Sequence, residues 1–430
     1  MANVYPSYKT LCGWNALLPS RTPNPVLEGD QSADVVVVGA GFTGVACARQ
    51  WQRLSSHSRV VVIDSSEVGE GNPGRNSGFL LEIALADDAD PTSTQRMEAC
   101  NQLTRAAMRE IAEDVKASGA SVDLQRAGTY RAAAGTAGIE ALGQYQTFLD
   151  AAGLTYRRLD HRDLERELGT RFYSAGLFSQ DCYLAQPAAL IRSLVASLPE
   201  SIDVYENTPL LGFNRVKNGW LLRCPAGEIR SRILVLANNA FAKALGVARP
   251  RLSSVFTYAG LTPVLEPDVL ANLGENQNWG ILPMHRLGST LRRTVDGRLL
   301  VRSLHDWERE GDSTAVRRAL LDRLARRFPQ LAGRDFEHVW GGAVGFTYNA
   351  APVWGEVEPG LFIAGGCNGG GTVKGTLFGK LLADLAHGDE TVPDVEALFG
   401  RASWMPPEPL RRVGFQVKAT IESWQGRQER

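Results

Sequence analysis

The sequence predicts an α/β fold with two domains, and three observations support this prediction. The chain has 430 residues, which is more than one small hydrophobic core usually organises. Residues 34–38 form a largely β-branched run that leads into glycines spaced G-x-G-x-x-G, and a helix-like segment follows. A second β-branched run, residues 59–64, ends in an aspartate. Strand, glycine turn, helix and second strand in this order indicate a parallel sheet with helices packed on its faces.

Composition and charge exclude several classes of protein. The formal net charge of −1 argues against binding to nucleic acid, which needs a basic surface. The six cysteines are scattered without a C-x-x-C pair, so we expect neither a metal site nor disulfides. No segment reaches the roughly 18 apolar residues of a membrane helix, and the N-terminus lacks the apolar region of a secretory signal. We therefore expect a cytoplasmic protein.

The glycine motif predicts a dinucleotide-binding turn. Gly39, Gly41 and Gly44 allow a tight turn, a close approach of the main chain to a pyrophosphate, and close packing of helix on strand. A helix over 42–54 would point its N-terminal amides at the phosphates. Asp64 ends the second strand at the spacing where a carboxylate accepts hydrogen bonds from ribose hydroxyls. This pattern is typical of a Rossmann-type domain.

The residues after Asp64 favour a flavin over a nicotinamide. A loop dense in Gly, Ser and Asn, residues 65–79, stands where a nicotinamide enzyme would enter its next helix. Its G-R-N-S-G-F, after V-V-I-D, resembles the flavin loop of the FAD-dependent amine and amino-acid oxidoreductases. That family includes D-amino-acid oxidase, glycine oxidase and sarcosine oxidase, and the resemblance is greatest to γ-glutamylputrescine oxidase-like members. Pro73 stands where those members commonly have serine.

Three later segments resemble the same family in the same order. Residues 204–210 are similar to the strand whose backbone meets the adenine, and 233–240 to the strand that passes beneath the cofactor. Residues 360–385 read as a strand, a polyglycine turn and a helix. The amides at that helix N-terminus can stabilise negative charge on a flavin.

The resemblance implies bound FAD and a set of residues that contact it. Sarcosine oxidases bind flavin through a cysteine near the positions of Thr347 and Tyr348, and no cysteine is present there, so we expect non-covalent FAD. The expected contacts come from the glycine turns and from polar residues near them: Gly39, Gly41, Phe42, Thr43, Gly44, Asp64, Ser65, Gly74, Arg75, Asn76, Ser77, Gly78, Leu210, Ala237, Asn238, Gly366, Asn368, Gly369, Gly370, Gly371 and Thr372.

The same resemblance divides the chain into a discontinuous FAD-binding domain and a substrate domain with a mixed, largely antiparallel sheet. The expected segments of the FAD-binding domain are 30–85, 186–250 and 340–398, and those of the substrate domain are 86–185 and 251–339. Residues 1–29 are expected to form an N-terminal extension that packs on the body, and residues 399–430 a helical tail.

Four residues are candidates for the substrate side. Arginine suits a substrate carboxylate because its planar guanidinium binds both oxygens. Arg292 stands at the arginine of the family pattern Y-x-R-x-x-x-D-G-R, and Arg302 lies on the next strand-like segment; surface charges on an edge strand are the alternative for both. Tyr348 lies in a segment that matches the family pattern for the chain entering the flavin site. Lys374 is a weaker candidate, for activating oxygen.

The resemblance implies oxidation of a C–N bond in an amine or amino acid. In this family the free base gives a hydride to flavin N5, so no side-chain base is required, and the imine then hydrolyses. The electron acceptor is O₂ in an oxidase or another acceptor, such as a membrane quinone, in a dehydrogenase. A flavin-bearing subunit without catalysis is a further alternative, because Asn239, Cys367, Gly370 and Arg302 depart from the family pattern.

The tail allows two interpretations. Residues 404–424 place apolar side chains at helical spacing beside basic ones. Such a helix either docks on the protein's own surface or makes peripheral contact with a membrane. The sequence leaves the oligomeric state open, with a monomer as the simplest case.

Overall fold

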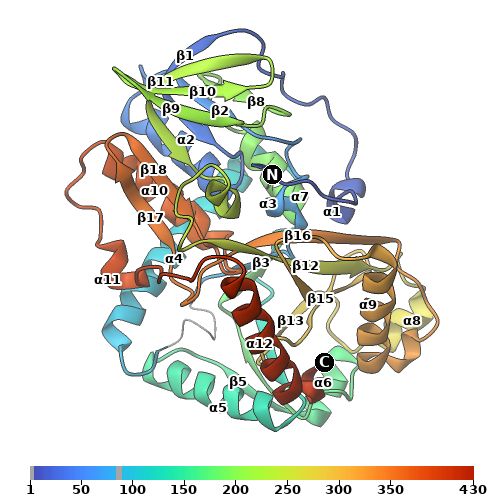
Figure 1. Cartoon of the computed structure of the whole chain (residues 1–430). Coiled ribbons are helices and arrows are strands. Elements are labelled where there is room, and N and C mark those ends of the chain that lie inside the picture. The colour runs from blue at the N-terminus through green and yellow to red at the C-terminus, as the bar shows by residue number, and fades with distance from the viewer. Residues whose placement is uncertain (1–3, 84–89) are drawn as a thin grey trace.

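Two large sheets organise the computed structural model, which describes residues 4–83 and 90–430 (Figure 1). The strands of the first sheet, in order across it, are β17 (Val353–Glu358), β18 (Leu361–Gly365), β11 (Gly227–Leu236), β1 (Gln31–Val38), β2 (Val60–Ile63) and β8 (Ile202–Tyr205), with the hairpin of β9 (Gly212–Val216) and β10 (Gly219–Cys224) attached to β11. Those of the second are β16 (His338–Phe346), β12 (Ser253–Leu261), β15 (Leu299–Trp307), β14 (Thr290–Arg293), β13 (Trp279–Pro283), β4 (Thr129–Ala133), β6 (Ala175–Ser179) and β5 (Arg157–Asp160). A small third sheet pairs β3 (Phe79–Leu81) with β7 (Cys182–Leu184).

Helices cover both large sheets. They are α1 (Gly13–Ala16), α2 (Phe42–Leu54), α3 (Asn72–Arg75), α4 (Thr94–Ser118), α5 (Thr136–Ala151), α6 (His161–Leu168), α7 (Pro187–Ala196), α8 (Pro267–Ala271), α9 (Ser313–Arg327), α10 (Val373–Ala386), α11 (Val395–Phe399) and α12 (Leu410–Gln425), with short 3₁₀ turns η1 (Asn239–Lys243), η2 (Pro329–Leu331) and η3 (Arg427–Glu429). Within the described ranges, no helix combines the length and the apolar character needed to cross a bilayer.

The centre of the first sheet is parallel and buried on both faces. Strand β1 pairs in parallel with β11 and β2. Val35 and Val37 pack with the apolar sides of α2, α4, α7 and α10, whereas Val36 and Val38 pack on the other face with residues of β10. Burial on both faces explains the unbroken apolar run, since no position of this strand faces water.

The second sheet is antiparallel except for the pair β13–β4. Its core packs against α6 and α9 (Figure 1). The predicted fold class is therefore confirmed. The first-sheet strands come from three stretches, 31–63, 202–236 and 353–365, as the discontinuous domain requires. The domain boundaries themselves stay predictions, and the one between residues 85 and 86 lies outside the described residues.

The individual helices that the sequence predicts form close to their expected ends. The helix expected over 42–54 is confirmed at both ends as α2. Helix α4 begins at Thr94, and the segment before it forms a turn, because the Asp90 carboxylate accepts hydrogen bonds from the Thr92 amide at 2.9 Å and its hydroxyl at 2.7 Å. Such a local turn competes with the first helical turn.

Helices α2 and α10 cross at very short range. A Cβ at Gly375 would lie 2.8 Å from the Thr43 hydroxyl oxygen, and a Cβ at Gly379 would overlap the carbonyl group of Thr43. Only glycine allows this approach of two backbones. As a result, the N-termini of α2 and α10 lie next to each other at the carboxyl ends of the parallel strands.

We expect Gly379→Ala to lower the thermal unfolding midpoint by the equivalent of about 1–3 kcal/mol, because the added methyl group forces the two helices apart. Gly143→Ala is the matched control, since Gly143 is also inside a helix but has open space around its Cβ position. That substitution should raise stability by about 0.5–1 kcal/mol. Equal shifts for the two variants, measured by calorimetry, would contradict the importance of the helix crossing.

Candidate active site

A cavity of about 630 Å³ lies between the two sheets. Its walls include the ends of β1 and β2, the first turns of α2 and α10, and side chains from β12, β14 and β15. Ligands of doubly wound sheets bind at the carboxyl ends of parallel strands, and helix N-termini attract anions there. The position of the cavity is therefore that of a dinucleotide site that continues toward the second sheet.

Most of the residues expected to contact the cofactor line this cavity. They are Gly39, Gly41, Phe42, Thr43, Asp64, Ser65, Arg75, Asn76, Ser77, Leu210, Ala237, Asn238, Gly366, Gly369, Gly370, Gly371 and Thr372. Gly44, Gly74, Gly78 and Asn368 do not line it. Gly44 and Gly74 serve packing instead, because a Cβ at either would overlap the carbonyl oxygen of Gly39 or Gly69.

Asp64 fixes the glycine turn after β1. One carboxylate oxygen accepts a hydrogen bond from the Ala40 amide at 2.8 Å, and the other accepts one from the Ser66 amide at 3.1 Å. Burial raises the pKa of Asp64, and these two amides oppose that rise. A carboxylate between the two strand ends thus joins the turn of β1 to the loop after β2.

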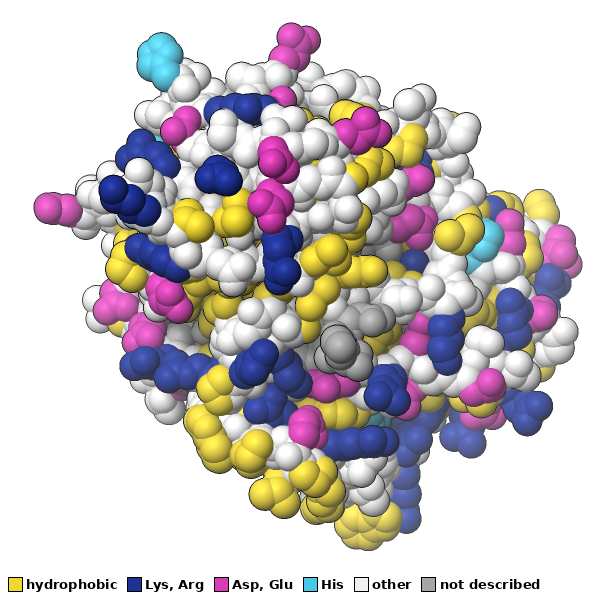
Figure 2. All heavy atoms as spheres, turned by 45° about the horizontal axis from the view of Figure 1, so that its top comes forward, with side chains coloured by type: hydrophobic (Ala, Val, Ile, Leu, Met, Phe, Trp, Pro, Cys, Tyr) yellow, Lys and Arg dark blue, Asp and Glu magenta, His cyan; other side chains and the backbone are white. Residues whose placement is uncertain are grey.

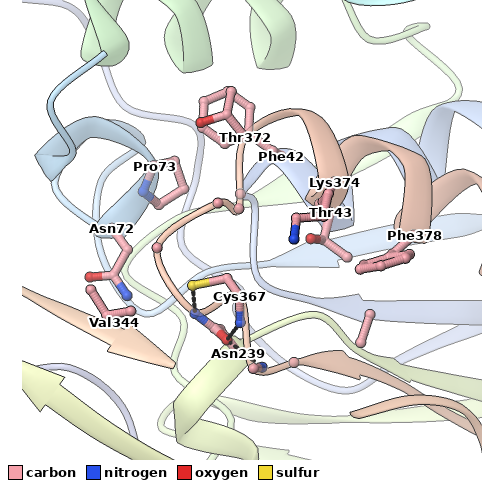
Figure 3. Close-up of a pocket in the computed structure, with 18 of the residues that line it drawn as sticks. Phe42, Thr43, Asn72, Pro73, Asn239, Val344, Cys367, Thr372, Lys374 and Phe378 are labelled. Carbon is pink, nitrogen blue, oxygen red and sulfur yellow. Dashed lines mark hydrogen bonds between the residues drawn. The ribbon is translucent and has the colours of Figure 1, made fainter. Parts of the chain in front are cut away.

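Asn239 fixes the second glycine turn, and the sequence did not single it out as a site residue. It adopts a left-handed φ of 51°. Its Oδ1 accepts hydrogen bonds from the Gly366 amide at 2.9 Å and the Cys367 amide at 3.3 Å, and its Nδ2 donates to Cys367 Sγ at 3.1 Å (Figure 3). Asparagine tolerates this backbone conformation better than most residues, so an asparagine at a strand end was the available signal.

Asn368 supports the same turn from the other side. Its Oδ1 accepts from the Thr347 amide at 3.0 Å, and its Nδ2 donates to the carbonyl oxygens of Ala350 at 3.0 Å and Gly366 at 2.7 Å. These bonds use both ends of the side-chain amide, so Asn368 holds the turn in shape without facing the cavity.

The cavity fits the cofactor that the sequence resemblance implies. Gly366, Gly369 and Gly371 leave the polyglycine turn without bulky side chains between strand β18 and helix α10. The Oδ1 atom of Asn238 is buried in the cavity wall and has no hydrogen-bond partner among the residues that the structure describes. Buried polar atoms normally have partners, so this oxygen indicates that a ligand with a donor belongs there. When bound, FAD would supply a two-electron acceptor next to the second sheet.

Two of the predicted substrate residues do not reach the cavity. Arg292 is buried behind the flavin loop, where its Nη1 donates to the carbonyl oxygens of Ser77 at 3.3 Å and of Ala185. Burial lowers the pKa of Arg292 to about 10. A Cβ at Gly78 would overlap this guanidinium. The expectation that Arg292 faces the substrate is therefore wrong, because its bonds go to the main chain of the loop.

Tyr348 also points away from the cavity. Its side chain is 62% exposed, and Lys418 Nζ lies 5.6 Å from its ring centroid. The chain turns after Phe346, so that Asn349 and Ala350 line the cavity while Tyr348 faces outward. Lys374, in the first turn of α10, does line the cavity, as expected.

Arg302 reaches the cavity from the second sheet. Its Nε donates to Thr257 Oγ1 at 3.1 Å, and both residues line the cavity. Burial lowers the pKa of Arg302. Among the residues that the structure describes, no carboxylate forms an ion pair with it. A cation in a partly buried site without a counter-ion favours an anionic ligand.

The N-terminal segment forms part of the cavity wall, which the sequence did not reveal. Tyr5 and Tyr8 line the cavity. The Tyr8 hydroxyl donates to Asn72 Oδ1, and the Arg75 guanidinium lies 3.8 Å from the Tyr8 ring centroid. Burial raises the pKa of Tyr8. The extension therefore packs on the body, as expected, and it also closes the site.

We expect Asp64→Asn to weaken the binding of added FAD by about 10–100-fold, because hydrogen bonds to a charged acceptor contribute about 1.5–3 kcal/mol. Asp203→Asn, in the neighbouring strand β8, is the control, since Asp203 pairs with Arg59 at the surface. Fluorescence titration of apoprotein with FAD measures both constants. Unchanged affinity in the Asp64 variant would show that this carboxylate does not contribute to cofactor binding.

Known proteins match this arrangement along most of the chain. A family described as FAD dependent oxidoreductase (DAO) matches residues 34–385. A probable oxidoreductase, OrdL, from Rhizobium meliloti is 25% identical over 402 residues, which cover 89% of both chains. The γ-glutamylputrescine oxidoreductase of Escherichia coli is 24% identical over 377 residues, which cover 85% of this chain and 86% of that one.

A solved structure shows the same fold. The glycine oxidase of Geobacillus kaustophilus superposes with a TM-score of 0.74 at 21% identity, covering 86% of this chain and 99% of that one. The family match spans well over half of the chain, and the fold, the FAD cofactor and the enzyme class predicted from the sequence are confirmed. The chain therefore belongs to the DAO family of FAD-dependent oxidoreductases, whose members oxidise amines and amino acids.

Proposed function

We propose that the protein oxidises the C–N bond of a small amino acid, or of another amine that carries a carboxylate, and that Arg302 binds this carboxylate. The observation that carries the proposal is the uncompensated guanidinium in the cavity wall. Relatives named glycine oxidase and γ-glutamylputrescine oxidoreductase act on substrates of this kind. Arginine binds a carboxylate through two parallel hydrogen bonds, which fixes the orientation of the substrate.

The geometry of Arg302 supports this role. Among the described residues Arg302 bonds to Thr257 through Nε alone, so the two terminal nitrogens of its guanidinium can bind a ligand. Strand β15 pairs with β14 and β12 on its two sides, so the base of the side chain is held rigidly. Rigid support is what a residue needs if it is to position a reacting carbon.

The other cavity residues on this side would exclude water and leave the substrate amine unprotonated. Phe241 and Leu282 line the cavity with apolar surface, and Tyr5 covers it from the N-terminal segment. When bound, FAD would supply the acceptor for the hydride that leaves the carbon next to nitrogen. Removing water strengthens the ion pair between Arg302 and a carboxylate.

Anaerobic reduction of the holoenzyme tests the proposed function. Amino acids and the matching amines without a carboxylate are mixed with the yellow enzyme, and flavin bleaching is followed by absorbance. We expect bleaching by one or more amino acids. If amines without a carboxylate bleach the flavin equally well, the role of Arg302 is wrong while C–N oxidation stands. If no amine bleaches it, the alternative of a flavin-bearing subunit without catalysis is correct.

We expect Arg302→Met to raise KM for the carboxylate substrate by about 100-fold, because a charge-assisted pair worth about 3 kcal/mol is lost. The maximal rate of flavin reduction should change much less, since the cofactor site is intact. Arg298→Met is the control. Arg298 lies in the same hairpin but pairs with Asp296 and Glu337 outside the cavity. An unchanged KM in the Arg302 variant, measured by stopped-flow, would contradict the assignment.

The electron acceptor and the oligomeric state stay predictions. Fast reoxidation of the bleached enzyme in air would identify an oxidase, and slow reoxidation a dehydrogenase. Light scattering of the purified holoenzyme would test the monomer. The peripheral membrane contact considered for the tail also stays a proposal, and it depends on the direction in which the apolar side chains of α12 point.

A further inference from the structure

The C-terminal end of the tail is clamped to the body. The Glu429 carboxylate accepts hydrogen bonds from the amides of Ala134 at 2.9 Å and Gly135 at 2.7 Å, at the start of helix α5. The Glu429 carbonyl oxygen accepts from Arg327 Nη2 at 2.6 Å. Glu429 is only 2% exposed. A buried carboxylate held by two amides is a strong anchor.

The N-terminal end of α12 is anchored as well. Arg411 is buried and donates from Nε to the Pro406 carbonyl oxygen at 2.9 Å and from Nη1 to that of Arg249 at 3.0 Å. Phe415, one helical turn later, packs with its ring centroid 4.7 Å from that of Trp307. The inner face of α12 therefore consists of Arg411, Phe415 and the residues in register with them.

The apolar side chains lie on the opposite face. Leu410, Val413, Val417, Ile421 and Trp424 are between 51% and 71% exposed. Their spacing of three or four residues places them in one line along the helix. We call this line the apolar stripe. The helix thus docks on the protein's own surface, which is one of the two interpretations of the sequence, but it does so through the face opposite the apolar side chains.

The charges around the apolar stripe are mostly basic. Arg412 and Lys418 are the exposed cations of α12, and Lys418 also lies over the Tyr348 ring. The acidic side chains of this segment have partners: Glu429 is buried, Glu422 lies 3.9 Å from Arg286, and Glu408 accepts a hydrogen bond from the Trp307 indole at 3.3 Å. The outer surface of α12 thus combines apolar side chains with cations.

The surrounding surface agrees with this description. In Figure 1 α12 crosses the front of the molecule below the first sheet. Figure 2 is tilted so that the front of Figure 1 moves to the lower part of the view. Hydrophobic side chains gather in this lower part, with Lys and Arg side chains beside them. Trp404, in the segment that precedes the helix, is 63% exposed.

We propose that the apolar stripe of α12 binds the surface of an anionic lipid bilayer, with the helix lying in the plane of the interface. Apolar residues on one face with flanking lysine and arginine are typical of interfacial helices. Tryptophan prefers the depth of the lipid headgroups, and Trp424, at the C-terminal end of the stripe, is 71% exposed.

A second copy of the chain fits the stripe less well. In a two-fold dimer the same patch faces itself, so Arg412 and Lys418 of one copy would lie against those of the other. Like charges across an interface are unfavourable. An anionic lipid surface attracts the same cations.

Vesicle flotation with the full-length holoenzyme tests the proposal. The probe is phosphatidylcholine vesicles with about one third phosphatidylglycerol, compared with phosphatidylcholine alone. We expect the protein to float with the anionic vesicles and to be released by high salt, which screens the attraction. Absence of flotation with anionic vesicles overturns the proposal.

Matched variants identify the surface that binds. Val417→Asp should weaken the partition onto anionic vesicles at least about tenfold, because one buried valine contributes about 1.5 kcal/mol or more. Val216→Asp is the control, since Val216 is exposed at the end of β9 and away from α12. Arg412→Glu with Lys418→Glu should remove the preference for phosphatidylglycerol.

Bound flavin and the thermal midpoint establish that each variant is folded, because all four positions are exposed. Equal flotation of the Val417 and Val216 variants overturns the proposal. A concentration-dependent dimer that the Val417→Asp variant abolishes also overturns it, since the occupant of the stripe is then a second copy.

Discussion

The contact between the backbone of Thr43 and Gly379 sets the separation of α2 and α10, and the cofactor site depends on that separation. Each helix N-terminus carries a partial positive charge that decays within about one turn. Two such ends act on the same ligand only if the helices begin close together. Because a methyl group at position 379 would overlap the Thr43 carbonyl group, glycine at this position keeps both helix ends directed at one cavity.

Most polar side chains around the cavity form hydrogen bonds to main-chain groups of the protein. Asp64 binds the first glycine turn, Asn239 binds the second, and Arg75 donates to the carbonyl oxygens of Glu70, Thr10 and Gly341. Turns held in this way present main-chain groups to a ligand without rearranging. Arg302 differs from them, since within the described residues its one hydrogen bond goes to Thr257, and this difference is why it suits a ligand and not the scaffold.

The sequence predicted the parallel half of the fold well because its signals are local. The run of valines before Gly39, the glycine spacing and Asp64 all lie within one strand–helix–strand unit, and each has one physical explanation. The second sheet was expected only through a family resemblance, since its strands come from distant segments and pair across long loops. Long-range pairing leaves little trace in the periodicity of a short segment.

The errors in predicting which side chains face the cavity have a common cause. Arg292 and Arg302 lie on adjacent strands, and Arg292 is paired with Leu300 while Arg302 is paired with Thr290. Paired positions and positions two apart on a strand share a face, so Arg292 and Arg302 lie on the same face of the sheet. Arg292 stands two residues farther along β14 than Thr290, which is paired with Arg302 and lines the cavity with it. The sequence does not show where along the strand the cavity ends. Tyr348 was expected to face the cavity and Asn239 was not named as a site residue, because a turn decides which neighbour faces inward.

The tail shows that helical periodicity gives the direction of an apolar face only relative to the helix itself. The spacing of the stripe predicted an amphipathic helix correctly, but Glu429 and Arg411 decide which side meets the body. Asn349, which lines the cavity, donates to the Arg401 carbonyl oxygen at 2.9 Å and accepts from the Ser403 amide at 3.0 Å. The cavity wall and the segment that leads into α12 are thus joined by hydrogen bonds, so a surface that binds the stripe lies next to the loop that borders the cavity.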